Sequence, residues 1–232
     1  MDGFKRKPIV ALGLCLLALG IAGCKGNPVK EGGLFAKTSD TVPGIMPPSE
    51  RIAAIRKMSQ EAVRAGGDAQ EQLALKLAAL YPHEGDPLVR AELVRAAATF
   101  GCPTAASLVR QATRDSDPDV RIAACKGLPK QQGPEAAAAL AEVLGSDTDL
   151  DVRLAAARAL GETRNAAAVA PLGSALEDSD PAMQYRAVSS LRATAPEDLG
   201  NDAKRWRQYV KGEPPSPPKP VSLAERIRGI FY

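Results

Sequence analysis

The sequence predicts an all-α protein, an α-solenoid of about four helical hairpins with a helical cap at each end. Two columns of residues recur at a constant period, which is typical of stacked structural repeats. An aspartate recurs after 31, 32 and 31 residues, at Asp86, Asp117, Asp149 and Asp180. A leucine recurs after 31, 32 and 32 residues, at Leu77, Leu108, Leu140 and Leu172. Alanine richness alone would not keep two independent columns in step, so the period indicates a repeated structural unit.

The residue types around each aspartate explain why a helix begins there. An aspartate at a helix N-cap accepts a hydrogen bond from a free backbone amide and complements the positive end of the helix dipole. Proline at the next position fixes φ where no amide donor is needed. Apolar residues then follow at helical spacing, for example Val120, Ala124 and Leu128, so one face of this second helix is apolar.

Each repeat also has an earlier, first helix. These first helices are expected at residues 68–81, 103–114, 134–145 and 165–177. The first of them opens with the capping-box pattern Asp68-Ala69-Gln70-Glu71, and Pro103 and Pro134 open the next two. The repeats together are expected to fill residues 68–195.

Composition and charge agree with this fold class and exclude several others. The chain has 232 residues, of which 45% are hydrophobic, 25% charged and 4% aromatic, so it is not collagen-like, disulfide-rich or wholly disordered. Its formal charge is +3. Without residues 1–23 the charge falls to +1, because three basic residues and one acidic residue are lost. This near-balance does not favour nucleic acid as a partner.

Residues 1–23 have the pattern of a signal for export. A basic stretch at residues 5–7 precedes an apolar run at 8–22, which is shorter than the roughly 20 residues needed to span a bilayer. The run ends in Ile-Ala-Gly-Cys at residues 21–24 and resembles the bacterial lipoprotein signal with its lipobox. The resemblance implies cleavage before Cys24, a diacylglycerol on its sulfur and acylation of the new amino group, hence a lipid anchor in the membrane. An ordinary secretory signal with a chance cysteine stays open as the alternative.

Lipidation at Cys24 would place the protein in the bacterial cell envelope. Lys25 follows the cysteine, and by resemblance to the enterobacterial sorting rule the lack of an aspartate there favours the outer membrane, facing the periplasm. Residues 24–48 are rich in glycine and proline and lack periodicity, so they are expected to form a flexible tether.

Capping elements flank the repeats. Residues 49–67 are expected to form an N-terminal capping helix, with Ile52, Ile55, Met58 and Ala62 on one face. Residues 196–211 are expected to form a C-terminal cap that carries Trp206, Tyr209 and Val210. Residues 212–232 are interpreted as a proline-rich linker and a terminal amphipathic segment, 222–232. Three docking places stay open for that segment: the solenoid itself, a partner, or the bilayer.

The repeated stretch resembles HEAT-like repeats, specifically the short bacterial kind also found in phycobilin lyases. The motif that carries the resemblance is Asp-Pro-x-Val-Arg at the start of the second helix and Ala-x-x-Ala-Leu at its end. The second and third repeats match it, whereas the fourth has Met183-Gln184 and Ser189-Ser190, and the first ends in Ala97. Degenerate terminal repeats are expected of a solenoid, whose ends face solvent.

The resemblance also implies where a partner would bind. In HEAT-like hairpins the second helices line the concave side. Two rows of side chains would face that side: a basic row of Arg95, Lys126 and Arg158, continued by Ser189, and an apolar row of Ala91, Ile122, Leu154 and Tyr185. Together they predict a groove for an extended peptide or an acidic segment of another envelope protein. A solvated basic face without a partner stays open as the alternative. By the same resemblance, the column Arg90, Arg121 and Arg153 is structural, each arginine pairing with the aspartate of a turn.

No motif for catalysis, metal or cofactor is found in the sequence. HEAT-like hydroxylases hold two iron atoms with several His-Glu pairs, but His83 with Glu84 is one pair in a turn, so His83 is interpreted as a solvated loop residue. Cys102 and Cys125 remain after export. They are either two small buried thiols or a disulfide in an oxidising compartment.

The function predicted from the sequence is therefore a non-catalytic scaffold or adaptor, anchored in the envelope membrane. Two alternatives stay open: a HEAT-like enzyme of the lyase or hydroxylase type, and a purely structural spacer. The sequence predicts no oligomeric state.

Overall fold

The computed structural model describes residues 46–131 and 135–217. The export signal, Cys24, most of the tether, Pro134 and the segment 222–232 lie outside these residues. The described part contains ten α-helices and four short 3-10 helices and no strand, so the prediction of an all-α fold is confirmed.

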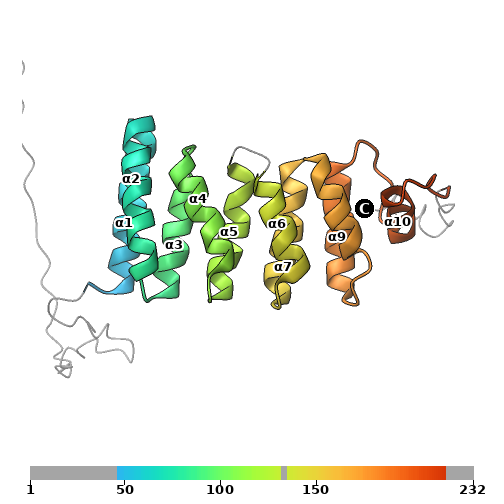
Figure 1. The fold of residues 1–232 in the computed structure, drawn as a ribbon, viewed down its shortest axis with the longest axis horizontal. Coiled ribbons are helices and arrows are strands. Elements are labelled where there is room, and N and C mark those ends of the chain that lie inside the picture. The colour runs from blue at the N-terminus through green and yellow to red at the C-terminus, as the bar shows by residue number, and fades with distance from the viewer. Residues whose placement is uncertain (1–45, 132–134, 218–232) are drawn as a thin grey trace, which may run out of the picture. The chain divides into compact units, whose positions relative to one another are not determined.

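The α-helices form two layers. Their bounds are α1 Pro48–Ala65, α2 Gly67–Leu80, α3 Pro87–Ala97, α4 Pro103–Gln111, α5 Pro118–Gly127, α6 Glu135–Ser146, α7 Leu150–Thr163, α8 Val169–Ala175, α9 Pro181–Thr194 and α10 Ala203–Val210. Helices α1, α3, α5, α7 and α9 pack successively against one another in the layer of second helices, and α2, α4, α6 and α8 make the layer of first helices. The hairpins follow one another side by side in chain order, with α10 against α8 and α9 at the end (Figure 1).

The repeated aspartates cap the second helices as the sequence predicts. Asp86 accepts a hydrogen bond from the amide of Leu88 at 2.8 Å, and Asp117 accepts one from Asp119 at 2.9 Å. Asp149 and Asp180 cap α7 and α9 in the same way. Three of these four helices have proline directly after the cap.

The core lies between the two layers and is built of leucine and alanine. The repeated leucines, Leu77, Leu108, Leu140 and Leu172, are at most 1% exposed. At the C-terminal end Trp206 is fully buried, and its indole N–H donates to the Gly200 carbonyl at 2.8 Å. Val210 of α10 lies over Gly173 of α8, where a Cβ would be only 2.3 Å from Val210 Cγ1. The expected C-terminal seal of large side chains is therefore present.

Cys102 and Cys125 are free thiols in the structure, so the disulfide that the sequence left open between them does not form. Cys102 is half-buried at the N-cap of α4, and Cys125 is buried in α5. Burial raises the pKa of the Cys125 thiol to about 12, which keeps it protonated at neutral pH.

Two expectations at the N-terminal end need correction. The capping box at Asp68 does not form: the N-cap of α2 is Gly66, whose φ of 94° turns the chain directly from α1 into α2, and Asp68 lies inside the first turn. In addition, α1 is more than a cap. It packs beside α3 in the layer of second helices, and its Pro48 and Arg51 occupy the places of Pro87 and Arg90.

Candidate functional site

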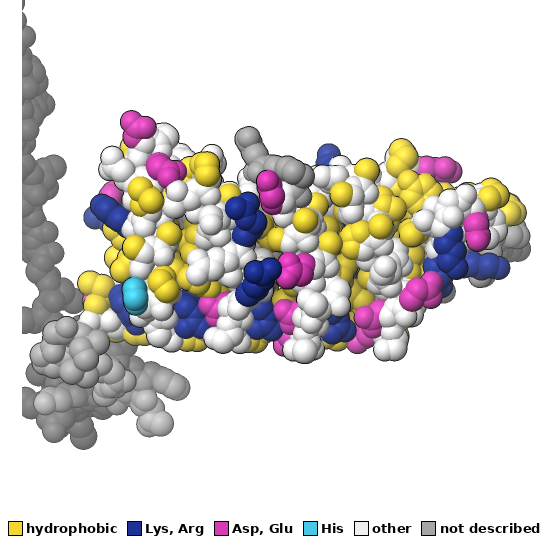
Figure 2. All heavy atoms as spheres, viewed as in Figure 1, with side chains coloured by type: hydrophobic (Ala, Val, Ile, Leu, Met, Phe, Trp, Pro, Cys, Tyr) yellow, Lys and Arg dark blue, Asp and Glu magenta, His cyan; other side chains and the backbone are white. Residues whose placement is uncertain are grey.

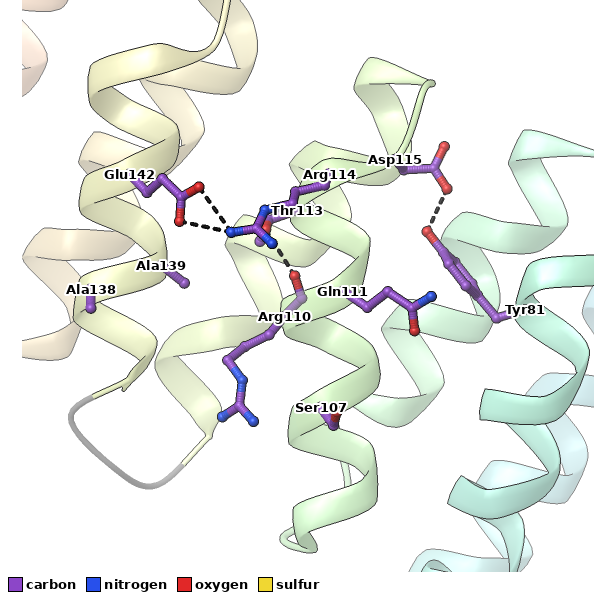
Figure 3. Close-up of a pocket in the computed structure, with 10 residues that line it drawn as sticks. All are labelled: Tyr81, Ser107, Arg110, Gln111, Thr113, Arg114, Asp115, Ala138, Ala139 and Glu142. Carbon is purple, nitrogen blue, oxygen red and sulfur yellow. Dashed lines mark hydrogen bonds and ion pairs between the residues drawn. The ribbon is translucent and has the colours of Figure 1, made fainter.

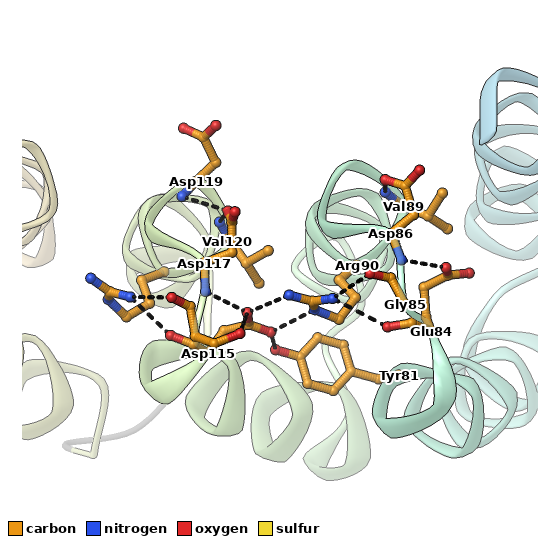
Figure 4. A network of polar contacts seen from close by, with 12 residues as sticks. Tyr81, Glu84, Gly85, Asp86, Val89, Arg90, Asp115, Asp117, Asp119 and Val120 are labelled. Atoms are coloured by element: carbon orange, nitrogen blue, oxygen red, sulfur yellow. Dashed lines mark hydrogen bonds and ion pairs between the residues drawn. The ribbon is translucent and has the colours of Figure 1, made fainter.

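One edge of the solenoid carries a ladder of arginines and acidic residues that links successive repeats (Figure 4). Arg90 donates from Nε and Nη2 to the two Asp115 carboxylate oxygens at 2.9 and 2.8 Å, and its Nη1 bonds the backbone of its own turn. Arg121 holds Asp147 in the same way at 2.7 and 3.0 Å. The basic and acidic side chains alternate along the lower edge in Figure 2. The prediction that this arginine column is structural is confirmed.

The ladder extends further than the predicted column. Arg153 reaches Asp178 at 3.5 Å, and Gln184 replaces the arginine in α9 while keeping a bond to the Asp178 carbonyl at 2.7 Å. At the other end Arg51 of α1 pairs with Glu84. The sequence signal for this ion pair is Pro48, which precedes Arg51 by three residues as Pro87 precedes Arg90.

In the central part of the ladder each buried carboxylate is paired with an arginine. Burial alone would raise the pKa of Asp115, but hydrogen bonds from Arg90 and Tyr81 outweigh it and hold that pKa below its usual value. Burial also raises the pKa of Asp147, and the bonds from Arg121 likewise bring it below normal. Burial and the neighbouring Asp115 raise the pKa of Tyr81, so its hydroxyl stays a donor.

The basic row lies on the exposed face of the second-helix layer. Arg95, Lys126 and Arg158 are all exposed and occupy equivalent positions of α3, α5 and α7. The structure adds a fourth member. Because Arg51 is the counterpart of Arg90, Arg56 of α1 is the counterpart of Arg95, and it is exposed as well. We use "basic row" below for Arg56, Arg95, Lys126 and Arg158.

Acidic side chains neutralise part of the basic row. Glu92 accepts from Arg56 at 2.7 and 3.0 Å and from Arg95 at 3.1 Å, and its side chain is only 7% exposed. Burial would raise the pKa of Glu92, but Arg56 and then Arg95 lower it below normal. Arg158 donates from Nε to Glu162 at 3.1 Å. Lys126 makes no ion pair with any described residue, so it is the row's free cation.

The apolar row is only partly exposed. Ala91 is fully buried, Ile122 and Leu154 are half-buried against the core, and Tyr185 is 67% exposed. The apolar-row position of each helix faces the neighbouring helices of the layer. A small side chain at this position is therefore buried, and only a large one reaches solvent. The structure therefore shows one projecting aromatic ring beside the basic row and no continuous apolar stripe.

Several hollows of the described residues lie away from the basic row. A polar one of about 630 Å³ separates α4 from α6 and is lined by Tyr81, Ser107, Gln111 and Arg114 among others (Figure 3). Arg114 crosses it to Glu142 of α6 at 3.0 Å. An apolar hollow of about 250 Å³ lies at the N-terminal end, where α1, α2 and α3 meet.

Another hollow lies on the face of the basic row. It has a volume of about 330 Å³ and separates α7 from α9. Arg158, Arg164, Arg186, Ser189 and Ser190 line it. Of these residues the sequence predicts only Arg158 and Ser189, as parts of one row, and it does not indicate that Arg164 and Arg186 lie beside them.

His83 lies in the 3-10 helix Tyr81–His83 and is exposed, as the sequence predicts for a loop residue. Within residues 46–131 and 135–217, no group of three or more His, Cys, Asp or Glu side chains could hold a metal ion. None of the helices described is long and apolar enough to cross a membrane.

Comparison with known proteins agrees with this architecture. The family model for HEAT repeats matches residues 74–161 and 143–204, together more than half of the chain. Among solved structures, human deoxyhypusine hydroxylase in complex with glycerol is 23% identical over 53% of this chain and 44% of its own, with a TM-score of 0.49. A designed armadillo repeat protein in complex with the peptide (KR)4 is 16% identical over 71% of this chain and 86% of its own, with a TM-score of 0.45. No curated protein matches the sequence.

Proposed function

The chain belongs to the HEAT-repeat family, and from this premise we propose that it is a non-catalytic scaffold that binds an extended acidic segment of another envelope protein. The binding surface is the exposed face of the second-helix layer. Tyr185 adds an aromatic contact at the C-terminal end of this face.

The observation that carries this proposal is the basic row itself. It presents one cation from each of four successive helices, at the same position in each helix. Neighbouring helices pack about 8–10 Å apart, and an extended chain advances about 3.3 Å per residue. Every third residue of an extended partner would therefore meet one cation, so an acidic residue at that spacing would pair along the whole row.

The test of the basic row is charge reversal at its free cation. Lys126→Glu should weaken binding of a labelled, glutamate-rich 12-residue peptide about tenfold, because an attraction becomes a repulsion without breaking any ion pair within the fold. Fluorescence anisotropy at low salt measures the dissociation constant. Lys76→Glu, the same change on the exposed side of α2 in the other layer, is the matched control and should leave binding unchanged. Equal affinities for both variants and the original protein would rule out the basic row as the binding surface.

We extend the proposal to the location of the protein. The basic n-region, the short apolar run and the lipobox ending at Cys24 support a lipid-anchored lipoprotein, facing the periplasm from the outer membrane. The repeats would be those of the phycobilin-lyase kind, used here for binding.

Replacing the lipidated residue tests this anchor. Cys24→Ala removes the only sulfur that the lipobox places at the cleavage point, so the protein should move from the membrane fraction to the soluble fraction after cell fractionation. Labelling with an alkyne analogue of palmitate should be lost at the same time. Cys102→Ala leaves the lipobox intact and serves as the control. Palmitate labelling that persisted in Cys24→Ala would refute lipid anchoring at this residue.

No specific observation favours the enzymatic alternative. His83 is exposed, and its neighbour Glu84 is already engaged by Arg51 in the ladder. The spacer alternative differs from the scaffold in one measurable way, because a spacer needs no affinity for an acidic peptide.

A further inference from the structure

The hollow between α7 and α9 gathers three guanidinium groups around an open volume of about 330 Å³. Arg158 comes from the middle of α7, Arg164 from the residue that ends α7, and Arg186 from α9. Glu162 is the one carboxylate in the lining, and it is bound to Arg158. The lining therefore carries an excess of two positive charges, which favours a doubly charged anion.

Most of the donors in this hollow are unused. Arg158 bonds Glu162 through Nε at 3.1 Å, and its two terminal nitrogens have no partner among the described residues. Within the same described residues, Arg164 and Arg186 have no side-chain hydrogen bond or ion pair. The three arginines that line this hollow carry like charges, so an anion bound among them would be attracted and would satisfy the donors.

A serine that is mostly buried adds a donor to the same hollow. Ser190 is only 5% exposed, and its side chain has no hydrogen-bond partner in the described part of the chain. Its hydroxyl oxygen is not closed off from solvent, so a ligand in the hollow could reach it. Gly161 on the facing helix lets Ser190 approach closely, because a Cβ at Gly161 would be 3.0 Å from Ser190 Oγ. Ser189, which is half-buried, adds a second hydroxyl to the lining.

The backbone at Arg164 is a third, independent feature. Arg164 has φ 49° and ψ 33°, and it is the only residue other than glycine with positive φ in the described part of the chain. Glycine is the usual residue at this left-handed position after a helix, because a Cβ there is sterically unfavourable. An arginine that keeps such a conformation at the rim of a basic pocket suggests that its side chain is needed there.

We propose that this pocket binds the phosphate group of inorganic phosphate or of a phosphate monoester. Guanidinium forks and hydroxyls are the donors that suit the oxygens of phosphate. Arg158 belongs to both the pocket and the basic row, so the biological role of the site, to fix one end of the bound partner, rests on the proposed function. The affinity of the pocket for phosphate does not depend on the proposed function.

The test measures phosphate binding directly, by isothermal titration calorimetry on the full chain in detergent at pH 8 and low salt. Phosphate is then a dianion. Arg186→Gln and Ser190→Ala should each weaken binding of inorganic phosphate, the arginine change about tenfold, because a hydrogen bond to a charged group is lost. Arg110→Gln removes an exposed arginine of α4 in the other layer and should leave phosphate binding unchanged.

Arg164→Gly separates a role in binding from a role in the fold. Glycine relieves the backbone at φ 49° and should raise Tm by a few degrees, while phosphate binding falls. A purely structural arginine would lower Tm when replaced. Glycerol 3-phosphate, titrated in parallel, shows the source of the group: tighter binding than inorganic phosphate indicates an ester, and weaker binding indicates the free ion.

The outcomes also separate this site from the proposed function. Lys126→Glu lies outside the pocket, so it should lose the acidic peptide and keep phosphate. A protein that binds neither phosphate nor glycerol 3-phosphate, or binds both equally in Arg186→Gln and Arg110→Gln, would overturn the phosphate site, whereas the peptide result would stand by itself.

Discussion

Asp115→Ala should destabilise the protein by about 3–5 kcal/mol, because it breaks a buried ion pair of the ladder and leaves three hydrogen-bonding partners of this carboxylate without it. The Asp115 side chain is 6% exposed and that of Arg90 14%. The carboxylate accepts both Arg90 bonds, the Tyr81 hydroxyl and the Asp117 amide. A loss of this size corresponds to a fall of roughly 10 °C in Tm for a chain of this length, which circular dichroism at 222 nm would follow.

The matched control is an arginine–aspartate pair that lies in solvent. Arg192 donates to both carboxylate oxygens of Asp198 at 2.9 and 2.7 Å, but the two side chains are 41% and 53% exposed. Asp198→Ala should therefore change the free energy of unfolding by less than about 1 kcal/mol. If Asp198→Ala lost as much stability as Asp115→Ala, burial would not explain how much the ladder contributes to the free energy of unfolding.

The pH dependence of Asp115→Ala follows from the direction of the pKa shift. The folded protein holds the pKa of Asp115 below its ordinary value, so at low pH the unfolded chain binds the proton more readily. The carboxylate thus stabilises the fold fully above the unfolded pKa of about 3.9, and this contribution is lost as pH falls through the lower folded pKa. The original protein and the variant should therefore differ most at pH 6 and converge below about pH 4.

The ladder and the leucine columns were predictable from sequence because local backbone chemistry imposes them on every repeat. Each aspartate must cap a helix, and each arginine must reach the next turn, so both recur with the period. Arg56 is not predicted because its helix does not keep the period. Arg51 precedes Arg90 by 39 residues, whereas the repeats recur after 31 or 32. When α1 is interpreted only as a cap, nothing in the sequence indicates that Arg56 bonds Glu92.

The pocket between α7 and α9 could not be predicted because it is made of departures from the repeat. Arg186 lies where the preceding repeats have Ala123 and Ala155, and Ser190 lies where they have Gly127 and Ala159. The repeat pattern is lost at these positions, so periodicity does not indicate which of these residues lie close together. Only the packing of α9 on α7 brings them beside Arg158 and Arg164.

Gly161→Ala should destabilise the stack between the third and fourth hairpins. The added Cβ would lie 2.9 Å from both Cα and Cβ of Ser190, and because Cα belongs to the backbone of α9, no change of rotamer can relieve the contact. Alanine favours a helix over glycine by about 1 kcal/mol, but forcing two packed helices apart costs about 1–3 kcal/mol. We therefore expect a net loss of stability, and a larger one for Gly161→Val.

Gly145→Ala is the matched control for this prediction. Gly145 lies in α6, and a Cβ there would meet nothing within 4 Å, so only the gain in helix propensity remains. That variant should be more stable than the original protein by up to about 1 kcal/mol. Hairpins of a solenoid contact only their neighbours, so Gly161→Ala should expose α9 and α10 to protease first, and limited proteolysis should cut beyond Thr163 before the preceding repeats. If Gly161→Ala were as stable as Gly145→Ala, the close approach of α7 and α9 would not restrict the side chain that fits at residue 161.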